Sequence, residues 1–81
     1  MAGNLNYYTY KGRQARGLIA ALQVLLDQNL LSAEEKGVAK VLQSRLRGAA
    51  MKEDEEYTMV AFSDKQNELL QHVEQSLWRL T

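Results

Sequence analysis

The chain has 81 residues, of which 46% are hydrophobic and 25% charged, a composition typical of one globular domain and not of a disordered chain. It contains no cysteine, which excludes disulfides and thiolate metal sites. Its formal net charge is zero, but residues 1–52 hold eight Lys or Arg and three Asp or Glu, whereas residues 53–81 hold two and seven. This asymmetry favours neutralisation between the two halves; head-to-tail packing of copies, or a basic face that meets an acidic partner, are the alternatives.

Targeting and membrane signals are absent from the sequence. No basic start is followed by an apolar run, so we expect no secretory signal. The longest apolar cluster, residues 18–26, is interrupted by Gln23 and is too short to span a bilayer. We therefore expect a cytoplasmic protein without a membrane partner, located in the host cytoplasm if the source is viral.

Residues 1–12 are predicted to form an extended arm or strand. Tyr7-Tyr8-Thr9-Tyr10 is rich in strand-favouring types, and Lys11-Gly12 breaks the pattern. We place a short strand at residues 5–10.

Residues 13–48 are predicted to form an αα-hairpin. Apolar residues recur at three- and four-residue spacing along the first helix, at Ala15, Leu18, Ile19, Leu22, Leu25 and Leu26. The helix should end near Asn29, which tolerates a left-handed backbone. Ser32-Ala33-Glu34-Glu35 has the pattern of a capping box that begins the second helix. The buried face of that helix is predicted to hold Val38, Val41, Leu42 and Leu46, and Gly48 to form its C-cap.

Residues 49–56 are an acidic connector, either an extension of the second helix or a loop. The segment 57–62 favours a strand, after which Ser63-Asp64 would cap a third helix within residues 57–81. The alternative is a single long helix over residues 53–80. The predicted fold is a mainly α single domain, residues 1–81, with an αα-hairpin, a third C-terminal helix and two short strands in the order β-α-α-β-α.

Catalysis and metal binding find little support in the sequence. His72 is the only histidine, so a histidine base would need a nucleophile and an orienting group from elsewhere in the fold. Glu68 lies one turn before it, but a metal needs at least one further ligand. The carboxylates of residues 53–56 form a contiguous run that solvent reaches from both sides, which gives no contrast of pKa values. We therefore expect no enzyme, no cofactor and no metal.

Three surfaces remain as candidates for binding. The last helix carries Leu70 and Trp78, and tryptophan is enriched at interface hot spots. Together with the acidic approach, this helix would form a protein–protein interface, and the candidate interface residues are Leu70, Trp78, Glu53, Asp54, Glu55 and Glu56. The expected function is that of a regulator, adaptor or inhibitor that binds another protein or itself stoichiometrically, with a homo-oligomer as the expected state.

The second and third candidates are electrostatic. Cations beside tyrosines suit phosphates and unpaired bases, so a nucleic-acid or nucleotide site is the alternative function, with Tyr7, Tyr10, Lys11, Arg13 and Arg16 as its residues. As a further alternative, the acidic run, residues 53–56, would imitate a phosphate backbone and block an enzyme that handles nucleic acid, in the manner of a small viral-type inhibitor.

Overall fold

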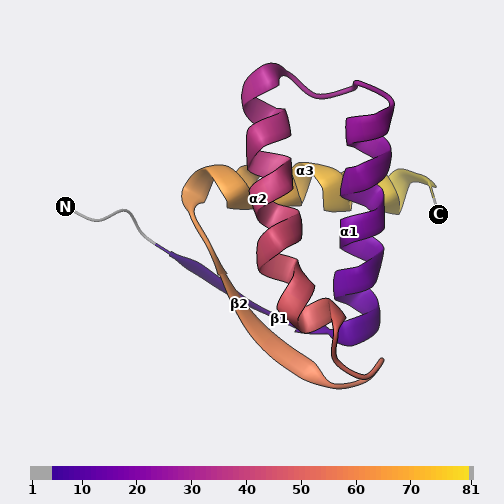
Figure 1. The fold of residues 1–81 in the computed structure, drawn as a ribbon, viewed down its shortest axis with the longest axis vertical. Helices are drawn as coiled ribbons and strands as arrows, with labels where there is room; N and C mark the ends of the chain where they lie inside the picture. The colour runs from indigo at the N-terminus through magenta and orange to yellow at the C-terminus, as the bar shows by residue number, and fades with distance from the viewer. Residues whose placement is uncertain (1–4, 81) are drawn as a thin grey trace.

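Two antiparallel helices, a third helix that crosses them and a two-stranded sheet make up the fold (Figure 1). The computed structural model describes the backbone of residues 5–80 and the side chains of residues 5–75. The elements in chain order are β1 (Asn6–Lys11), α1 (Gly12–Asp27), α2 (Ala33–Ala50), β2 (Tyr57–Phe62) and α3 (Asp64–Leu80). The predicted β-α-α-β-α order is therefore confirmed. No helix in the described part of the chain is both long and apolar enough to cross a membrane.

The αα-hairpin forms as its turn signals predict. Helix α1 ends at Asp27, and Asn29 adopts a left-handed backbone with φ of 57°. The N–H of Leu30 then donates to the carbonyl of Leu25 at 3.1 Å, which satisfies one of the carbonyls at the end of the helix. Ser32 and Glu35 form the reciprocal capping box, with bonds of 3.2 Å and 2.9 Å.

Two details of α2 differ from the prediction. Gly48 is not the C-cap, because the helix continues through it to Ala50. The continuation is supported by Arg16 of α1, whose Nη1 donates to the carbonyl of Ala50 at 2.9 Å and so satisfies a terminal acceptor from another helix. Val41 is 44% exposed and not on the buried face, where Ala39 is fully covered.

The segment that was ambiguous in sequence is a strand followed by a helix. Strand β2 pairs antiparallel with β1, from Lys11 opposite Tyr57 to Asn6 opposite Phe62, so a single helix over residues 53–80 is wrong. Ser63 caps α3 as predicted: its backbone N–H donates to Gln66 Oε1 at 2.9 Å, and its hydroxyl accepts from the N–H of Gln66 at 3.4 Å. The long-range partner β1 is what makes the strand the stable choice.

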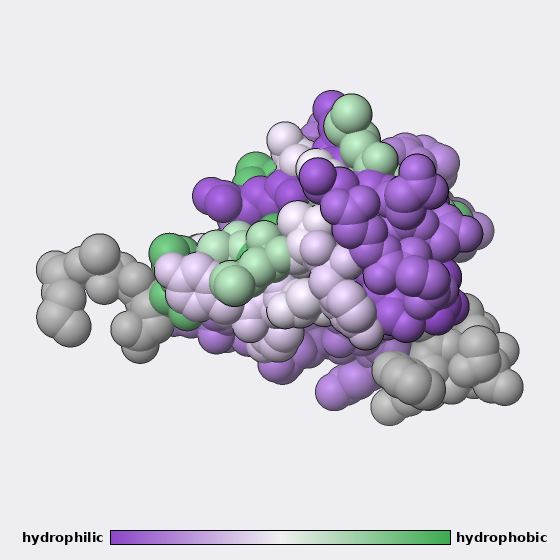
Figure 2. All heavy atoms as spheres, turned by 90° about the horizontal axis from the view of Figure 1, so that it is seen from below, coloured by the Kyte–Doolittle hydropathy of each residue, from purple (hydrophilic) through white to green (hydrophobic). Residues whose placement is uncertain are grey.

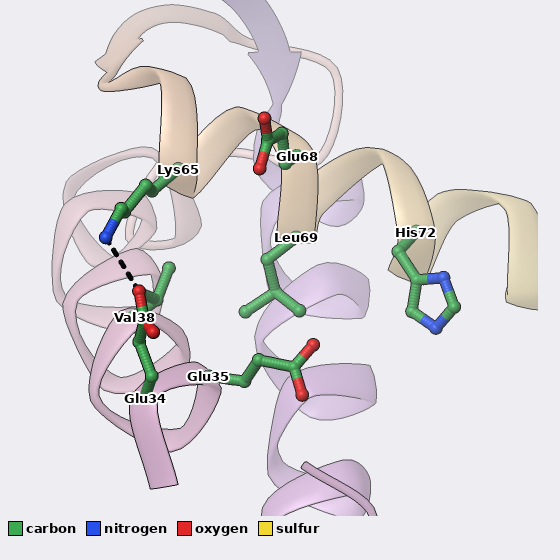
Figure 3. Close-up of a pocket in the computed structure, with 7 residues that line it drawn as sticks. All are labelled: Glu34, Glu35, Val38, Lys65, Glu68, Leu69 and His72. Carbon is green, nitrogen blue, oxygen red and sulfur yellow. Dashed lines mark hydrogen bonds and ion pairs between the residues drawn. The ribbon is translucent and has the colours of Figure 1, made fainter. Parts of the chain in front are cut away.

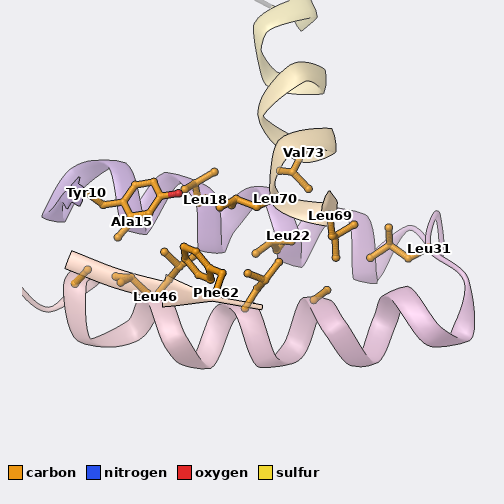
Figure 4. Close-up of a cluster of buried hydrophobic side chains, with 14 residues drawn as sticks. Tyr10, Ala15, Leu18, Leu22, Leu31, Leu46, Phe62, Leu69, Leu70 and Val73 are labelled. Atoms are coloured by element: carbon orange, nitrogen blue, oxygen red, sulfur yellow. The ribbon is translucent and has the colours of Figure 1, made fainter. Parts of the chain in front are cut away.

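The core lies where the hairpin, one face of the sheet and α3 meet (Figure 4). Phe62 is fully buried, with the rings of Tyr8 and Tyr10 each 6.1 Å from it between centroids. The buried side chains are Tyr10, Ala15, Leu18, Leu22, Leu31, Ala39, Leu42, Leu46, Ala49, Val60, Phe62, Leu69, Leu70 and Val73. The sheet therefore buries one face against the helices and leaves the other to solvent.

Candidate functional site

The outer face of the sheet exposes an apolar surface. Side chains alternate along each strand, so Tyr10, Val60 and Phe62 turn inward while Tyr7, Tyr57 and Met59 turn outward. Tyr7 is 61% exposed, Tyr57 60% and Met59 67%. Leu5, which continues the same alternation just before β1, is 53% exposed. We call these four residues, Leu5, Tyr7, Tyr57 and Met59, the sheet patch.

The sheet patch is large for a chain of this size. Seen from below, green and pale residues gather beside the grey N-terminal residues, while the other end of this face is purple (Figure 2). The two tyrosines together expose about 240 Å², taking about 200 Å² for a whole tyrosine side chain. With Leu5 and Met59 the patch reaches about 400 Å², comparable to the largest patch on a typical monomer, which is often a binding site.

The two strands of the same sheet also have open edges. Within residues 5–80, β1 and β2 pair only with each other, so each strand has one edge without a neighbouring strand. An open edge is a template for pairing with another chain. The two-stranded sheet therefore has both an exposed apolar face and open strand edges.

The predicted basic segment and acidic run meet each other. Residues 51–56, here called the acidic loop, lie against the start of α1. Glu55 pairs with Lys11 at 2.7 Å and with Arg13 at 2.9 Å, and Asp54 pairs with Arg16. The hydrogen bond from Lys11 holds the pKa of the Glu55 carboxyl below its usual value and raises the pKa of the Lys11 ammonium. Neutralisation between the two halves of the chain is confirmed for these pairs.

Backbone bonds join the acidic loop to α1 as well. The N–H of Gly12 donates to the carbonyl of Glu56 at 3.1 Å, and Arg16 Nη1 donates to the carbonyl of Lys52 at 3.0 Å in addition to that of Ala50. Arg16 is therefore a clamp that ties the end of α2 and the loop to α1. No sequence signal marked this role, because the partners lie 34 to 38 residues away.

This arrangement leaves few of the predicted residues available for an N-terminal anion site. Lys11, Arg13 and Arg16 already have carboxylate partners, and Tyr10 is only 7% exposed, so its ring cannot stack on a base. Burial raises the pKa of the Tyr10 hydroxyl. Of the five residues assigned to that site, Tyr7 alone is both exposed and outside the ion pairs of the structure's described part.

The residues predicted for a protein interface are separated. Leu70 is 1% exposed and belongs to the core, so its assignment to an interface is wrong: the crossing of α3 over the hairpin covers it. Trp78 lies outside the described side chains. In the acidic loop, Asp54 and Glu55 are paired with α1 and Glu56 with Lys52 at 3.8 Å, which leaves Glu53 as the one loop carboxylate without an ion pair among residues 5–75.

A hollow of about 330 Å³ between α2 and α3 contains His72 at its rim (Figure 3). Lys65 pairs with Glu34 across it at 2.7 Å, and Leu69 points into the space between the helices. The pKa of Glu35 is lowered, first by the backbone N–H of Ser32, so this carboxyl is held ionised as part of a helix cap. General acid–base chemistry needs two carboxyls with different pKa values, one of them raised so that it is protonated near neutral pH. The capping role of Glu35 lowers its pKa and therefore works against such chemistry.

Helix α2 carries cations that the sequence reasoning did not single out. From Lys36 to Ala50 every charged residue of the helix is basic, namely Lys36, Lys40, Arg45 and Arg47. None of these four forms an ion pair with any residue from 5 to 75. The signal that could have found them was the run of seventeen residues after Glu35, residues 36–52, which contains no Asp or Glu.

Comparison with known proteins gives no match to a family model, to a curated protein or to a solved structure. What the chain does must therefore be argued from its own surfaces.

Proposed function

We propose that this chain is a non-enzymatic binding module that docks a protein through the sheet patch and acts in fixed proportion to its partner, as a regulator, adaptor or inhibitor. The observation that carries the proposal is the exposure of Tyr7, Tyr57 and Met59, each at least 60%, on a single face of the sheet. Apolar side chains gathered in this way are what a folded chain normally covers, and aromatic residues and methionine are enriched in interfaces.

A second copy of the chain is the occupant that the surface fits. A standard interface buries about 800 Å² on each partner, of which about 60% is apolar. The sheet patch, at about 400 Å², supplies most of that apolar share. In a two-fold contact the same patch faces itself, so tyrosine and methionine side chains on each copy meet those on the other.

Charge does not oppose this contact. The cation on the outer face of the sheet, Lys11, is paired with Glu55 and lies 5.5 Å from the centre of the Tyr57 ring. The chain has zero formal net charge, so two copies do not repel each other as wholes. We therefore propose that the self-association expected from sequence uses the sheet patch in place of the last helix.

Analytical ultracentrifugation from about 1 μM to 1 mM tests the proposal, with Met59→Lys as the disrupting variant. Met51→Lys is the matched control, because Met51 is 82% exposed in the acidic loop and lies outside the patch. We expect the wild type and Met51→Lys to dimerise, and Met59→Lys to weaken the dimer at least about tenfold while its circular dichroism is unchanged. A wild-type chain that is monomeric at 1 mM, or equal dimerisation of all three, would refute it.

A further inference from the structure

The exposed side of α2 carries a row of three cations and one serine at helical spacing. Lys36, Lys40, Ser44 and Arg47 follow one another at intervals of four, four and three residues, which places them on one side of the helix. Lys40, Ser44 and Arg47 are exposed and Lys36 is partly exposed. We call these four residues the α2 ridge.

The ridge is distinct from the basic segment at the start of α1. The acidic loop forms ion pairs with Lys11, Arg13 and Arg16, whereas the ridge cations have no ion pair in the described portion. The two carboxylates of α2 are engaged elsewhere: Glu34 pairs with Lys65, and Glu35 closes the cap with Ser32. The positive charge of the ridge is therefore not neutralised by an ion pair with any side chain from residue 5 to 75.

Helix stability does not account for these cations. Lys36 lies in the first turn of α2, where positive charge opposes the helix dipole, and Lys40, about two turns into the helix, gains nothing from the dipole. Arg47, in the last turn, is the only ridge cation that the dipole favours. A surface that places Lys36 against the dipole, without a carboxylate partner among residues 5–75, is suited to an external anion.

The shape of the ridge indicates which anion it fits. From Lys36 to Arg47 the helix rises about 16 Å, and each strand of a duplex carries one phosphate per about 3.4 Å of the duplex axis. Beside the ridge, Gly37 and Gly48 have no atoms within 4 Å of the position that a Cβ would take, so a nucleic-acid backbone can approach closely. Ser44 adds a hydroxyl donor of the kind that contacts phosphate. The ridge holds no aromatic side chain for stacking on unpaired bases, which favours a duplex over a single strand.

We infer that the α2 ridge binds the phosphodiester backbone of duplex nucleic acid, independently of sequence, through Lys36, Lys40 and Arg47. This site lies on a different element from the sheet patch, so it extends the proposed function and does not depend on it.

Fluorescence anisotropy of the full chain with a labelled 20-base-pair DNA duplex tests the inference, from about 25 to 200 mM KCl. Three phosphate contacts predict that log K falls against log salt concentration with a slope of about −3, and that Kd lies on the order of 10 to 100 μM at the lowest salt. The double variant K36Q/K40Q should reduce the slope to about −1 and weaken binding at least about tenfold.

The matched control is K52Q/K65Q, which removes the same charge from cations that lie outside the ridge and are paired with Glu56 and Glu34. It should change Kd by less than about threefold. Met59→Lys, which tests the sheet patch, should leave the slope unchanged. A labelled RNA duplex and labelled polyglutamate separate the sources of negative charge: binding of either duplex with the expected slope supports the inference.

Three results would overturn it: no anisotropy change with either duplex at 1 mM protein, equal losses in the two double variants, or polyglutamate bound as tightly as DNA. The last result would assign the ridge to an acidic protein. Since all four substituted lysines are exposed or partly exposed, circular dichroism should show the same fold in every variant.

Discussion

Gly12 provides the sharpest test of how the acidic loop is attached to the helices. It is the first residue of α1 and is buried beneath the loop. A Cβ built at this position would lie closer than 3.0 Å to the backbone oxygens of both Lys52 and Glu53. Because these are backbone atoms, neither can move aside by a side-chain rotation, so Gly12→Ala must push the loop away from α1.

The cost follows from what the loop would lose. Overpacking of this kind costs about 1–3 kcal/mol. Moving the loop also stretches the bonds from the N–H groups of Gly12 and Arg13 to the carbonyls of Glu56 and Asp54, each of which contributes about 1 kcal/mol. We expect Gly12→Ala to lower the free energy of unfolding by about 2–4 kcal/mol, out of a total of about 4–12 kcal/mol for a chain of this length.

The assay is urea denaturation followed by circular dichroism at 222 nm, with Gly17→Ala and Gly37→Ala as controls. Both control glycines lie within helices, and a Cβ at either meets no atom within 4 Å. Each should therefore stabilise the protein by about 0.5–1 kcal/mol, because alanine is the better helix former. Glycine-to-alanine substitution should therefore lower the free energy of unfolding at Gly12 and raise it at the two control sites. If Gly12→Ala were as stable as the wild type, the close packing of loop and helix described above would be incorrect.

Three further predictions concern the Arg16 clamp, the core and the partly buried carboxyl of Glu74. Arg16→Ala should lower the free energy of unfolding by about 1 kcal/mol in thermal or urea melts, whereas Arg47→Ala should change it by less than about 0.5 kcal/mol; equal effects would refute the clamp. Leu46→Ala should cost about 2–5 kcal/mol by chemical denaturation, since Leu46 is fully buried, and a loss below 1 kcal/mol would contradict its position. Burial raises the pKa of Glu74, so the folded state binds its proton more tightly than the unfolded state does. Glu74→Gln should therefore raise the melting temperature at pH 7 and have no effect at pH 3, where the wild-type carboxyl is already protonated; a pH-independent effect would exclude this cause.

Local signals predicted the hairpin well. Asn29 and Ser32 act through atoms within a few residues of themselves, so their turn and capping roles could be inferred without knowledge of the fold. The apolar stripe of α1 is similarly local, and its members are buried or partly buried. Gly48 was misjudged because the group that satisfies the end of α2, the guanidinium of Arg16, comes from another helix.

The candidate site was much less predictable. The same tyrosine-rich segment contains Tyr7, which faces solvent, and Tyr10, which is buried, and only the register of β1 against β2 assigns each to its face. The sequence does not show which carboxylates pair with the cations of this segment, because those partners lie about 40 residues away, and so an anion site at these cations stayed open. Conversely, the sequence does not distinguish the cations of α2 from those of an ordinary solvated helix face. Only the structure shows that they form no ion pair with residues 5–75.

By itself the sequence determined the helical hairpin and its caps, because these depend on short spacings, and its composition favoured neutralisation between the two oppositely charged halves. Tertiary structure alone decided between a strand and a helix at residues 57–62, since a strand is stable there only with β1 beside it and the helices beneath it. The tertiary structure also decided which charged side chains form ion pairs within the described residues and which are left to bind a partner. An ion pair depends on distances between atoms that the chain brings together only on folding, so the sheet patch and the α2 ridge are properties of the fold.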